Sequence, residues 1–225
     1  LKSIQNDKII RGITFRGEGG IVCAGGDLKS FKSGLQDDNS NLADVEKMSE
    51  STGEFFELIN TIPVPVIMLA EGAAMAGGLG MLCAADIVVV TKDCKFALTE
   101  TTLGIVPAQI APYIVSRVGL SKARRLMLTA SRFTGIEAFE YGIADFVAEG
   151  SDELMKIESE IKKDILRCAS GANSITKEIV LATRNLDKDS LVKFAAKGFA
   201  KSMMSDEGKE GIKAFVEKRK PSWAE

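Results

Sequence analysis

The chain has 225 residues, and its 45% of hydrophobic residues can bury a sizeable core, in one large domain or in one domain with an appendage. The 29 basic and 31 acidic residues are spread along the chain and give a formal net charge of −2, which excludes the basic stripe that nucleic acid or an anionic membrane requires. The chain has no histidine, so Ser-His-Asp and Cys-His catalysis are excluded, and proton transfer is left to carboxylates, Lys, Tyr or Cys.

Strand and helix patterns alternate through the first 100 residues. Runs of β-branched and apolar residues predict strands, and hydrophobic residues at near-helical spacing predict helices. In chain order, the expected elements are a strand at residues 9–15, a glycine turn at 17–20, a helix at 42–60 closed by Pro63 and Pro65, a strand at 66–70, a helix from 77 to about 85, and strands at 87–90 and 95–98. This alternation indicates an α/β fold with mostly parallel strand pairing.

Helices dominate from residue 109 onward. Thr134 and Glu137 have the spacing of a capping box, and Gly142 stands where that helix is expected to stop. The other expected elements are helices at residues 109–118 and from 121, a strand at 144–148, and charged amphipathic helices at 152–168, 174–186, 190–204 and 206–219. We therefore expect a strand-rich core over residues 1–149 and a helical region over residues 150–225 that serves packing or assembly.

The first glycine-rich turn, residues 22–28 (VCAGGDL), stands between a strand and a helix. Glycines at such a place let the backbone approach a ligand closely, and the start of a helix offers unpaired amides. Gly26 is the candidate donor. Taken alone, the segment is also typical of a tight turn in which Asp27 caps the helix.

The second glycine-rich turn, residues 71–80 (EGAAMAGGLG), repeats this arrangement after another apolar strand. As a dinucleotide fingerprint it fails, because Cys83 stands where the third glycine belongs. Two such turns supply two backbone amides, here those of Gly26 and Gly77, that can converge on one oxygen and stabilise an oxyanion or enolate.

Glu100 follows the predicted strand at residues 95–98 and precedes Gly104 and Pro107. We expect its carboxylate to lie on a loop near the glycine turns, where a general base contributes roughly a hundredfold to ten-thousandfold. The alternative is an ordinary acid in a surface loop.

These motifs together resemble the crotonase superfamily of enoyl-CoA hydratases and isomerases, over nearly the whole chain. Residues 23–29 (CAGGDLK) resemble its first oxyanion-hole motif, with Gly26 as the donor, and residues 75–78 (MAGG) resemble the second, with Gly77 as the donor. Residues 83–87 are similar to a family stretch that ends in an aspartate and a strand. Residues 96–104 are similar to the segment that carries a catalytic glutamate, here Glu100.

The resemblance implies an α/β fold, the crotonase (ClpP-like) spiral of ββα units, with a helical C-terminal region that drives trimers or hexamers. It implies an acyl-CoA thioester as substrate and no separate cofactor, because coenzyme A is part of the substrate. The implied substrate contacts are Ala24, Asp27, Leu28, Ala108, Phe215 and Lys218, the last two reaching the coenzyme A of a neighbouring subunit. Family members usually begin with another strand and a helix that help to bind adenine, and we expect this chain to start inside that helix.

Gly80 departs from the family pattern, because hydratases of the two-glutamate type carry their other catalytic acid there. Residues 103–112 (LGIVPAQIAP) resemble bacterial 3-methylglutaconyl-CoA and isohexenylglutaconyl-CoA hydratases, which favours hydration of a 2-enoyl-CoA that is branched at C3 or carries a distal carboxylate. One glutamate would also suit a Δ3-Δ2 enoyl-CoA isomerase. A third hypothesis is a crotonase-like scaffold that binds acyl-CoA or a protein partner without turnover.

The remaining sequence features are expected to be structural. Four widely spaced cysteines without a C-x-x-C pair indicate reduced packing residues in an intracellular protein, and no metal site is expected. No apolar run reaches the roughly 20 residues that span a bilayer, so no membrane partner is expected. We expect a bacterial cytoplasmic location, or the mitochondrial matrix if a transit peptide has been removed.

Overall fold

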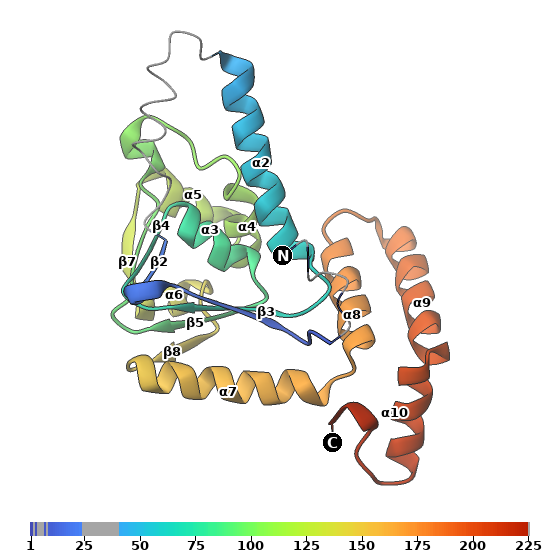
Figure 1. The fold of residues 1–225 in the computed structure, drawn as a ribbon. Helices are drawn as coiled ribbons and strands as arrows, with labels where there is room; N and C mark the ends of the chain where they lie inside the picture. Colours follow the sequence, from blue (N-terminus) through green and yellow to red (C-terminus); the bar gives the residue numbers. More distant parts are fainter. Residues whose placement is uncertain (2, 4–6, 8, 24–40, 225) are drawn as a thin grey trace. The chain divides into compact units, whose positions relative to one another are not determined.

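The computed structural model of the chain describes residues 1, 3, 7, 9–23 and 41–224, which form two compact units (Figure 1). The sheet unit comprises Thr14–Asn60 and Val66–Glu158. The helical unit comprises Leu1–Ile13, Thr61–Pro65 and Ser159–Glu225. No helix among the described residues is both long enough and apolar enough to cross a membrane.

The strands form two four-stranded sheets. The first has the order β1-β3-β5-β8 and the second the order β2-β4-β6-β7. The strands are β1 (Ile13–Arg16), β2 (Ile21–Cys23), β3 (Val66–Ala70), β4 (Ala73–Met75), β5 (Ile87–Thr91), β6 (Lys95–Ala97), β7 (Arg132–Thr134) and β8 (Phe146–Ala148). The pairs β3–β5, β5–β8, β2–β4 and β4–β6 are parallel, and β6–β7 is antiparallel. The expected α/β architecture with mostly parallel pairing is therefore confirmed.

The first sheet provides the centre of the core. All five residues of β3 are buried, as are four of the five in β5, which is why both strands read as continuous apolar runs. A polar network ties the amino ends of β3, β5 and β8 together. The N–H of Val66 in β3 donates to the carboxylate of Asp86, just before β5, at 2.8 Å. Asp145 accepts the backbone N–H of Val88 at 2.8 Å and binds Arg117 through both carboxylate oxygens at 3.1 Å. This arrangement fixes the strand ends that lie away from the glycine turns.

The helices of the sheet unit begin and end near the expected positions. They are α2 (Leu42–Thr61), α3 (Gly77–Ala84), α4 (Ala111–Val118), α5 (Leu120–Leu128) and α6 (Gly135–Tyr141), with short 3-10 turns η1 (Glu18–Gly20) and η2 (Glu100–Leu103). The predicted capping box of α6 is confirmed: Thr134 caps the N–H of Glu137, whose carboxylate accepts the N–H of Thr134. Gly142 follows with φ +85°, a left-handed stop.

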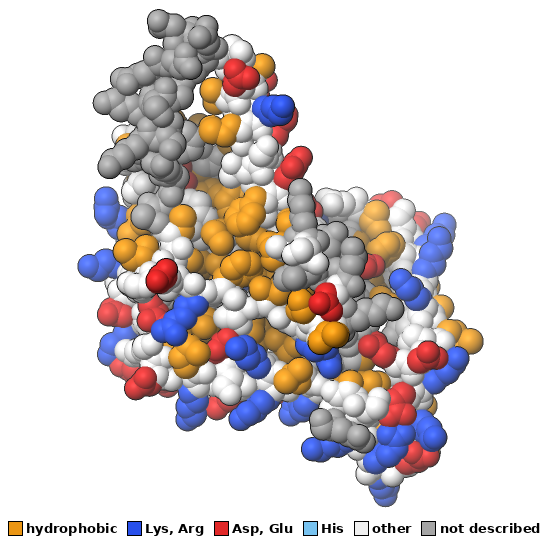
Figure 2. All heavy atoms as spheres, viewed as in Figure 1, with side chains coloured by type: hydrophobic (Ala, Val, Ile, Leu, Met, Phe, Trp, Pro, Cys, Tyr) orange, Lys and Arg blue, Asp and Glu red, His pale blue; other side chains and the backbone are white. Residues whose placement is uncertain are grey.

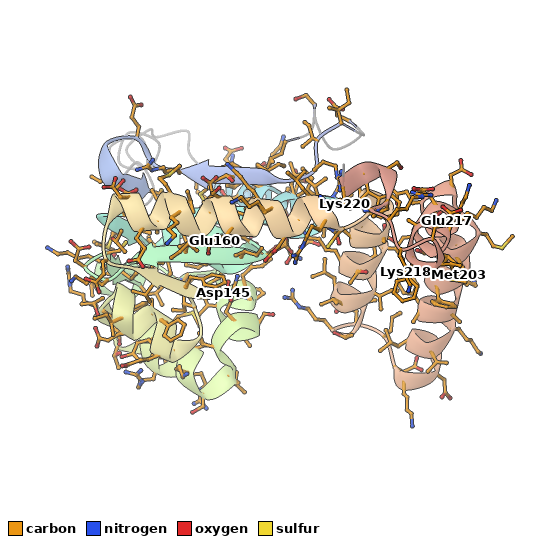
Figure 3. All side chains as sticks on the ribbon, turned by 90° about the horizontal axis from the view of Figure 1, so that it is seen from below. Asp145, Glu160, Met203, Glu217, Lys218 and Lys220 are labelled. Atoms are coloured by element: carbon orange, nitrogen blue, oxygen red, sulfur yellow. The ribbon has the colours of Figure 1, made fainter. Side chains whose placement is uncertain are left out.

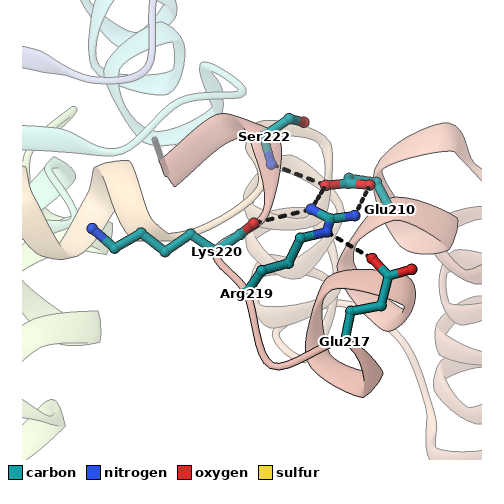
Figure 4. Close-up of polar contacts among 5 residues, drawn as sticks. All are labelled: Glu210, Glu217, Arg219, Lys220 and Ser222. Carbon is teal, nitrogen blue, oxygen red and sulfur yellow. Dashed lines mark hydrogen bonds and ion pairs between the residues drawn. The ribbon is translucent and has the colours of Figure 1, made fainter.

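The helical unit contains α8 (Ser170–Ala182), α9 (Lys188–Met204), α10 (Asp206–Val216) and η3 (Ser222–Ala224), and α7 (Ser151–Arg167) leads into it from the sheet unit. Its last turn is held by ion pairs around Arg219 (Figure 4). The guanidinium binds both carboxylate oxygens of Glu210, at 2.6 and 2.9 Å, and one of Glu217 at 2.8 Å. These bonds lower the pKa of Glu210 to about 2.

The structure departs from the expected elements in two respects. Strands β4 and β7 were not predicted. Each has only three residues, and each forms its hydrogen bonds with strands that lie far away in sequence. The first strand begins at Ile13, whereas the β-branched pattern extended back to residue 9. Within the segment expected to be a loop, Glu100 opens the short 3-10 turn η2, which Gly104 ends with φ +75°.

Candidate active site

Three neighbouring parallel strands, β2, β4 and β6, lead to the predicted site residues. β4 pairs in parallel with β6 with Met75 opposite Ala97, and β2 pairs in parallel with β4 on its other side. The carboxyl ends of parallel strands meet at one edge of a sheet, and ligands of open α/β sheets bind outside that edge. Gly77 follows β4 by two residues and Glu100 follows β6 by three. The strand register therefore brings Gly77 and Glu100 to the same edge of the second sheet.

Gly77 is the first residue of α3, and its amide lies ahead of the first bond of that helix. That bond runs from the N–H of Gly80 to the carbonyl oxygen of Ala76 at 3.1 Å. The amides of the first helical turn have no partner within the helix, so they can donate to a ligand oxygen. Gly77 is half-buried, and a Cβ at this residue would lie 3.9 Å from the Cζ of Phe56.

The end of β2 lies directly against this helix start. A Cβ added to Gly78 would lie only 2.8 Å from the Cβ of Cys23 and 2.9 Å from its carbonyl oxygen. Only glycine allows the two backbones to approach this closely. Cys23, where the described chain stops before residues 24–28, therefore lies beside the turn that carries the Gly77 amide. Of the first glycine-rich turn, the predicted donor Gly26 and the predicted contacts Ala24, Asp27 and Leu28 lie outside the described residues.

Glu100 is a buried acid. It is 9% exposed, and its Oε2 atom has no hydrogen-bond partner among the described residues. Removal from water raises the pKa of this carboxyl above its ordinary value, and a hydrogen bond to its own backbone N–H opposes this effect. Such a buried oxygen, at a sheet edge that also carries the amides of a helix start, has the character of a general base that awaits a substrate proton.

Apolar side chains fill the space beside Gly80. A Cβ at Gly80 would lie 2.2 Å from the Cγ2 of Ile110 and 3.3 Å from the Cε1 of Phe56. Both side chains are buried, and the ring of Phe56 also lies 6.0 Å from that of Tyr113. The space that a side chain at residue 80 would need is therefore occupied by α2 and by the residue that precedes α4. Figure 2 shows hydrophobic side chains gathered over this region of α2 and α3.

Three residues of this region were not singled out from the sequence. They are Ala76, which connects β4 to α3, and the two side chains that contact Gly80, Phe56 and Ile110. Phe56 appeared only as one of several hydrophobic residues at helical spacing. Nothing in the local pattern of residues 108–112 marks Ile110 as a neighbour of Gly80, because that contact joins segments 30 residues apart.

The remaining predicted residues lie elsewhere. Ala108 is exposed, and its N–H donates to the carbonyl oxygen of Val106 at 2.9 Å. Phe215 and Lys218 belong to the helical unit, where Phe215 is 85% exposed and Lys218 projects from the turn after α10 (Figure 3). Within the described part of the chain, no group of three or more Cys, Asp or Glu side chains is placed to hold a metal ion.

Comparisons with known proteins agree along the whole chain. The family model described as enoyl-CoA hydratase/isomerase matches residues 1–225. A protein of Bacillus subtilis (strain 168) named probable enoyl-CoA hydratase is 30% identical over 99% of this chain and 85% of its own length. The structure of AtuE of Pseudomonas aeruginosa matches with a TM-score of 0.96 at 38% identity, and the match covers 100% of this chain and 86% of the AtuE chain. An enoyl-CoA hydratase/isomerase from Marinobacter aquaeolei has a TM-score of 0.95 at 37% identity, with the same coverage.

Proposed function

The chain belongs to the enoyl-CoA hydratase/isomerase family and has its α/β crotonase fold, and we propose that it adds water across the 2,3 double bond of an enoyl-CoA. The observation that carries this proposal is the buried carboxylate oxygen of Glu100, which has no partner in the described part of the chain and lies at the sheet edge that also carries the Gly77 amide. An acid and an amide donor placed together suit a reaction that moves a proton while an enolate is stabilised.

The backbone amides of Gly26 and Gly77 hold the thioester carbonyl oxygen. Attack of water at C3 moves the electrons of the double bond toward that oxygen, and the two amides stabilise the negative charge that develops there. Glu100 takes a proton from the attacking water and returns a proton to C2. The product is a 3-hydroxyacyl-CoA, and the backbone near Ala108 helps to position the water.

The substrate is proposed to be branched at C3 or to carry a distal carboxylate. This finer assignment is supported by the sequence of residues 103–112, which resembles the corresponding segment of hydratases that act on glutaconyl-type thioesters. The hydratases that this segment resembles also carry glycine at the Gly80 position, and the apolar contacts at Gly80 leave no room for a second acid on that side of α3.

A Δ3-Δ2 enoyl-CoA isomerase is the second candidate. The same observation favours it, because Ile110 and Phe56 occupy the space of a side chain at residue 80, which leaves Glu100 as the acid of this sheet edge. One carboxylate suffices to take a proton from C2 of a 3-enoyl-CoA and return it to C4.

Product analysis in D₂O separates these functions. The enzyme is incubated with paired 2-enoyl and 3-enoyl thioesters, including 3-methyl and glutaconyl examples, and the products are identified by mass spectrometry. A hydratase forms a 3-hydroxyacyl-CoA that carries deuterium at C2, whereas an isomerase converts the 3-enoyl substrate without adding water. A scaffold without turnover binds acyl-CoA and forms neither product.

The role of Glu100 is tested by Glu100→Gln, which we expect to lower kcat by roughly a hundredfold to ten-thousandfold. Glu71→Gln is the matched control, because Glu71 is also a partly buried carboxylate of the sheet unit but is paired with Arg16 at 2.5 Å. Near-normal turnover of Glu100→Gln on every thioester would exclude Glu100 as the base.

We propose a trimer, or a hexamer built from two trimers, as the working assembly. Large apolar side chains on the helical unit remain exposed in the single chain: Val180, Val192, Phe199, Met204, Phe215 and Val216. Exposed apolar surface of this kind is typical of protein interfaces. In such an assembly Phe215 and Lys218 contact the coenzyme A moiety bound to a neighbouring subunit.

A further inference from the structure

Ala76 has a backbone conformation that side chains rarely allow. It stands between β4 and α3 with φ +48° and ψ −116°. A residue with a Cβ is strained there, and such strain persists only where the surrounding structure holds it in place. Strained residues cluster at functional sites, and this one directly precedes the amide donor Gly77.

Two hydrogen bonds hold Ala76 from opposite sides. Its N–H donates to the carbonyl oxygen of Ala97 at 2.8 Å, and its carbonyl oxygen accepts the N–H of Gly80 at 3.1 Å. Ala97 is the last residue of β6, three residues before Glu100. Ala76 therefore connects the strand that leads to the base with the helix that carries the donor.

The peptide plane between Ala76 and Gly77 shows how this conformation orients the N–H of Gly77. In a trans peptide the carbonyl and the following N–H point in opposite directions. The carbonyl of Ala76 points into α3, where Gly80 donates to it, so the N–H of Gly77 points out of the helix start. The dihedral angles of Ala76 thus set the direction of the donor that binds the thioester oxygen.

We propose that Ala76 is a positioning residue whose left-handed backbone, anchored to Ala97, aims the Gly77 amide at the substrate oxygen and keeps it in register with Glu100. This inference rests on the proposed function and adds to it the residue that couples donor and base. The strain is retained because a relaxed backbone at this residue would turn the amide away from the sheet edge.

The test is a graded series at residue 76 with a matched control in the preceding strand, β4. Ala76→Gly removes the strain and is expected to keep kcat within about threefold, with an unchanged or higher Tm. Ala76→Val opposes the left-handed backbone and is expected to lower kcat by about 100-fold, the loss typical of one misplaced oxyanion donor. Ala76→Ser is expected to fall between the two, and it replaces the Val variant if that variant does not fold.

Ala73→Val adds the same bulk to β4, three residues earlier, at a partly exposed residue with ordinary strand geometry. It is expected to keep kcat close to that of the parent enzyme. Two further measurements distinguish a misdirected Gly77 amide from a general loss of structure. The Kd for free coenzyme A, which has no thioester carbonyl, and the acid-limb pKa of kcat/KM, which reports Glu100, are both expected to stay unchanged in Ala76→Val.

Several results would overturn the inference. They are a lower Tm for Ala76→Gly, equal effects of Ala76→Val and Ala73→Val on kcat per folded molecule, and a parallel loss of affinity for free coenzyme A. Failure of the proposed function gives a different pattern, because Glu100→Gln then retains turnover. If Glu100→Gln is inactive while Ala76→Val behaves like Ala73→Val, the positioning role alone is wrong.

Discussion

At the scale of single residues, the site combines a buried polar group with a strained backbone. Glu100 keeps a carboxylate oxygen buried without a partner among the described residues, and Ala76 keeps a strained backbone. Each of these features lowers stability. Their presence together beside Gly77 is the pattern expected of a site in which chemistry, not stability, selects the residues.

The buried carboxyl of Glu100 predicts a dependence of stability on pH. Its pKa is raised in the folded state, so between the unfolded and folded pKa values the folded state binds more protons, and stability falls as pH rises through that window. Glu100→Gln removes this loss. We expect the variant to have a higher Tm than the parent at pH 7 to 8, by an amount that shrinks as pH falls below the ordinary pKa of about 4.3. Thermal unfolding across pH measures it, and a pH-independent difference would contradict it.

Replacement by alanine is predicted to be costly for stability at Gly80 and nearly neutral at Gly77. Gly80→Ala places a Cβ 2.2 Å from the Cγ2 of Ile110, and we expect it to destabilise the fold by about 1–3 kcal/mol. Gly77→Ala meets its nearest atom, the Cζ of Phe56, only at 3.9 Å, so its effect on urea unfolding should stay within about 1 kcal/mol.

A double-mutant cycle identifies the clash. Ile110→Ala removes the Cγ2 atom that a Cβ at Gly80 would meet. If this contact is the cause, Gly80→Ala combined with Ile110→Ala is less destabilising than the sum of the two single changes. Simple additivity would show that the cost of Gly80→Ala arises from other contacts, such as those with the Cβ of Ile110 at 2.8 Å and the Cε1 of Phe56 at 3.3 Å.

At the scale of elements, the turn after α10 illustrates a cap that uses an unusual residue. Lys218 follows α10 with φ +54°, and the N–H of Arg219 donates to the carbonyl oxygen of Ala214 at 3.0 Å. This is the place where helices commonly use glycine, because a side chain is disfavoured in the left-handed region. The bonds of Arg219 to Glu210 and Glu217 hold the turn in spite of this (Figure 4).

Replacement of Lys218 separates its backbone strain from its charge. Lys218→Gly relieves the strain and is expected to stabilise the protein by up to about 1 kcal/mol, whereas Lys218→Ala keeps the strained Cβ and gives no such gain. If Lys218 contacts coenzyme A as proposed, both variants lose affinity for it to a similar extent. Calorimetric unfolding and titration with coenzyme A measure the two effects, and full affinity in either variant would argue against the contact.

At the scale of the whole molecule, the exposed apolar residues of the helical unit predict assembly. Phe199 of α9 is 66% exposed, and we expect Phe199→Glu to weaken the oligomer in light scattering, because it places a charge in an apolar interface. Lys197→Gln is the matched control, since it changes the net charge equally on the same helix but removes no apolar contact. An oligomer that is unchanged by Phe199→Glu would place the interface elsewhere.

Mixed oligomers test whether subunits share sites. Subunits with Glu100→Gln lack the base, and subunits with Lys218→Ala lack the proposed coenzyme A contact. When the two inactive or weakened variants are unfolded and assembled together, sites that combine an intact Glu100 with the Lys218 of a neighbour should regain activity. No gain over the separate variants would indicate that each chain uses its own Lys218.

Sequence alone determined the features that rest on local chemistry. The buried strands β3 and β5, the capping box of α6, the glycine-rich turn before α3 and the C-terminal helices follow from residue pattern, because propensity, capping and hydrophobic period act over a few neighbours. The motifs also sufficed for the family, since several of them occur in the family's order.

Only the tertiary structure decided how these parts meet. The alignment of β4 with β6 brings Gly77 and Glu100 to one edge, the burial of Glu100 raises its pKa, and the packing of Ile110 on Gly80 excludes a side chain there. The strained backbone of Ala76 is likewise set by its bonds to Ala97 and Gly80. Each of these features depends on contacts between segments that are distant in sequence or on backbone angles that no residue type imposes, which is why local pattern could not predict them.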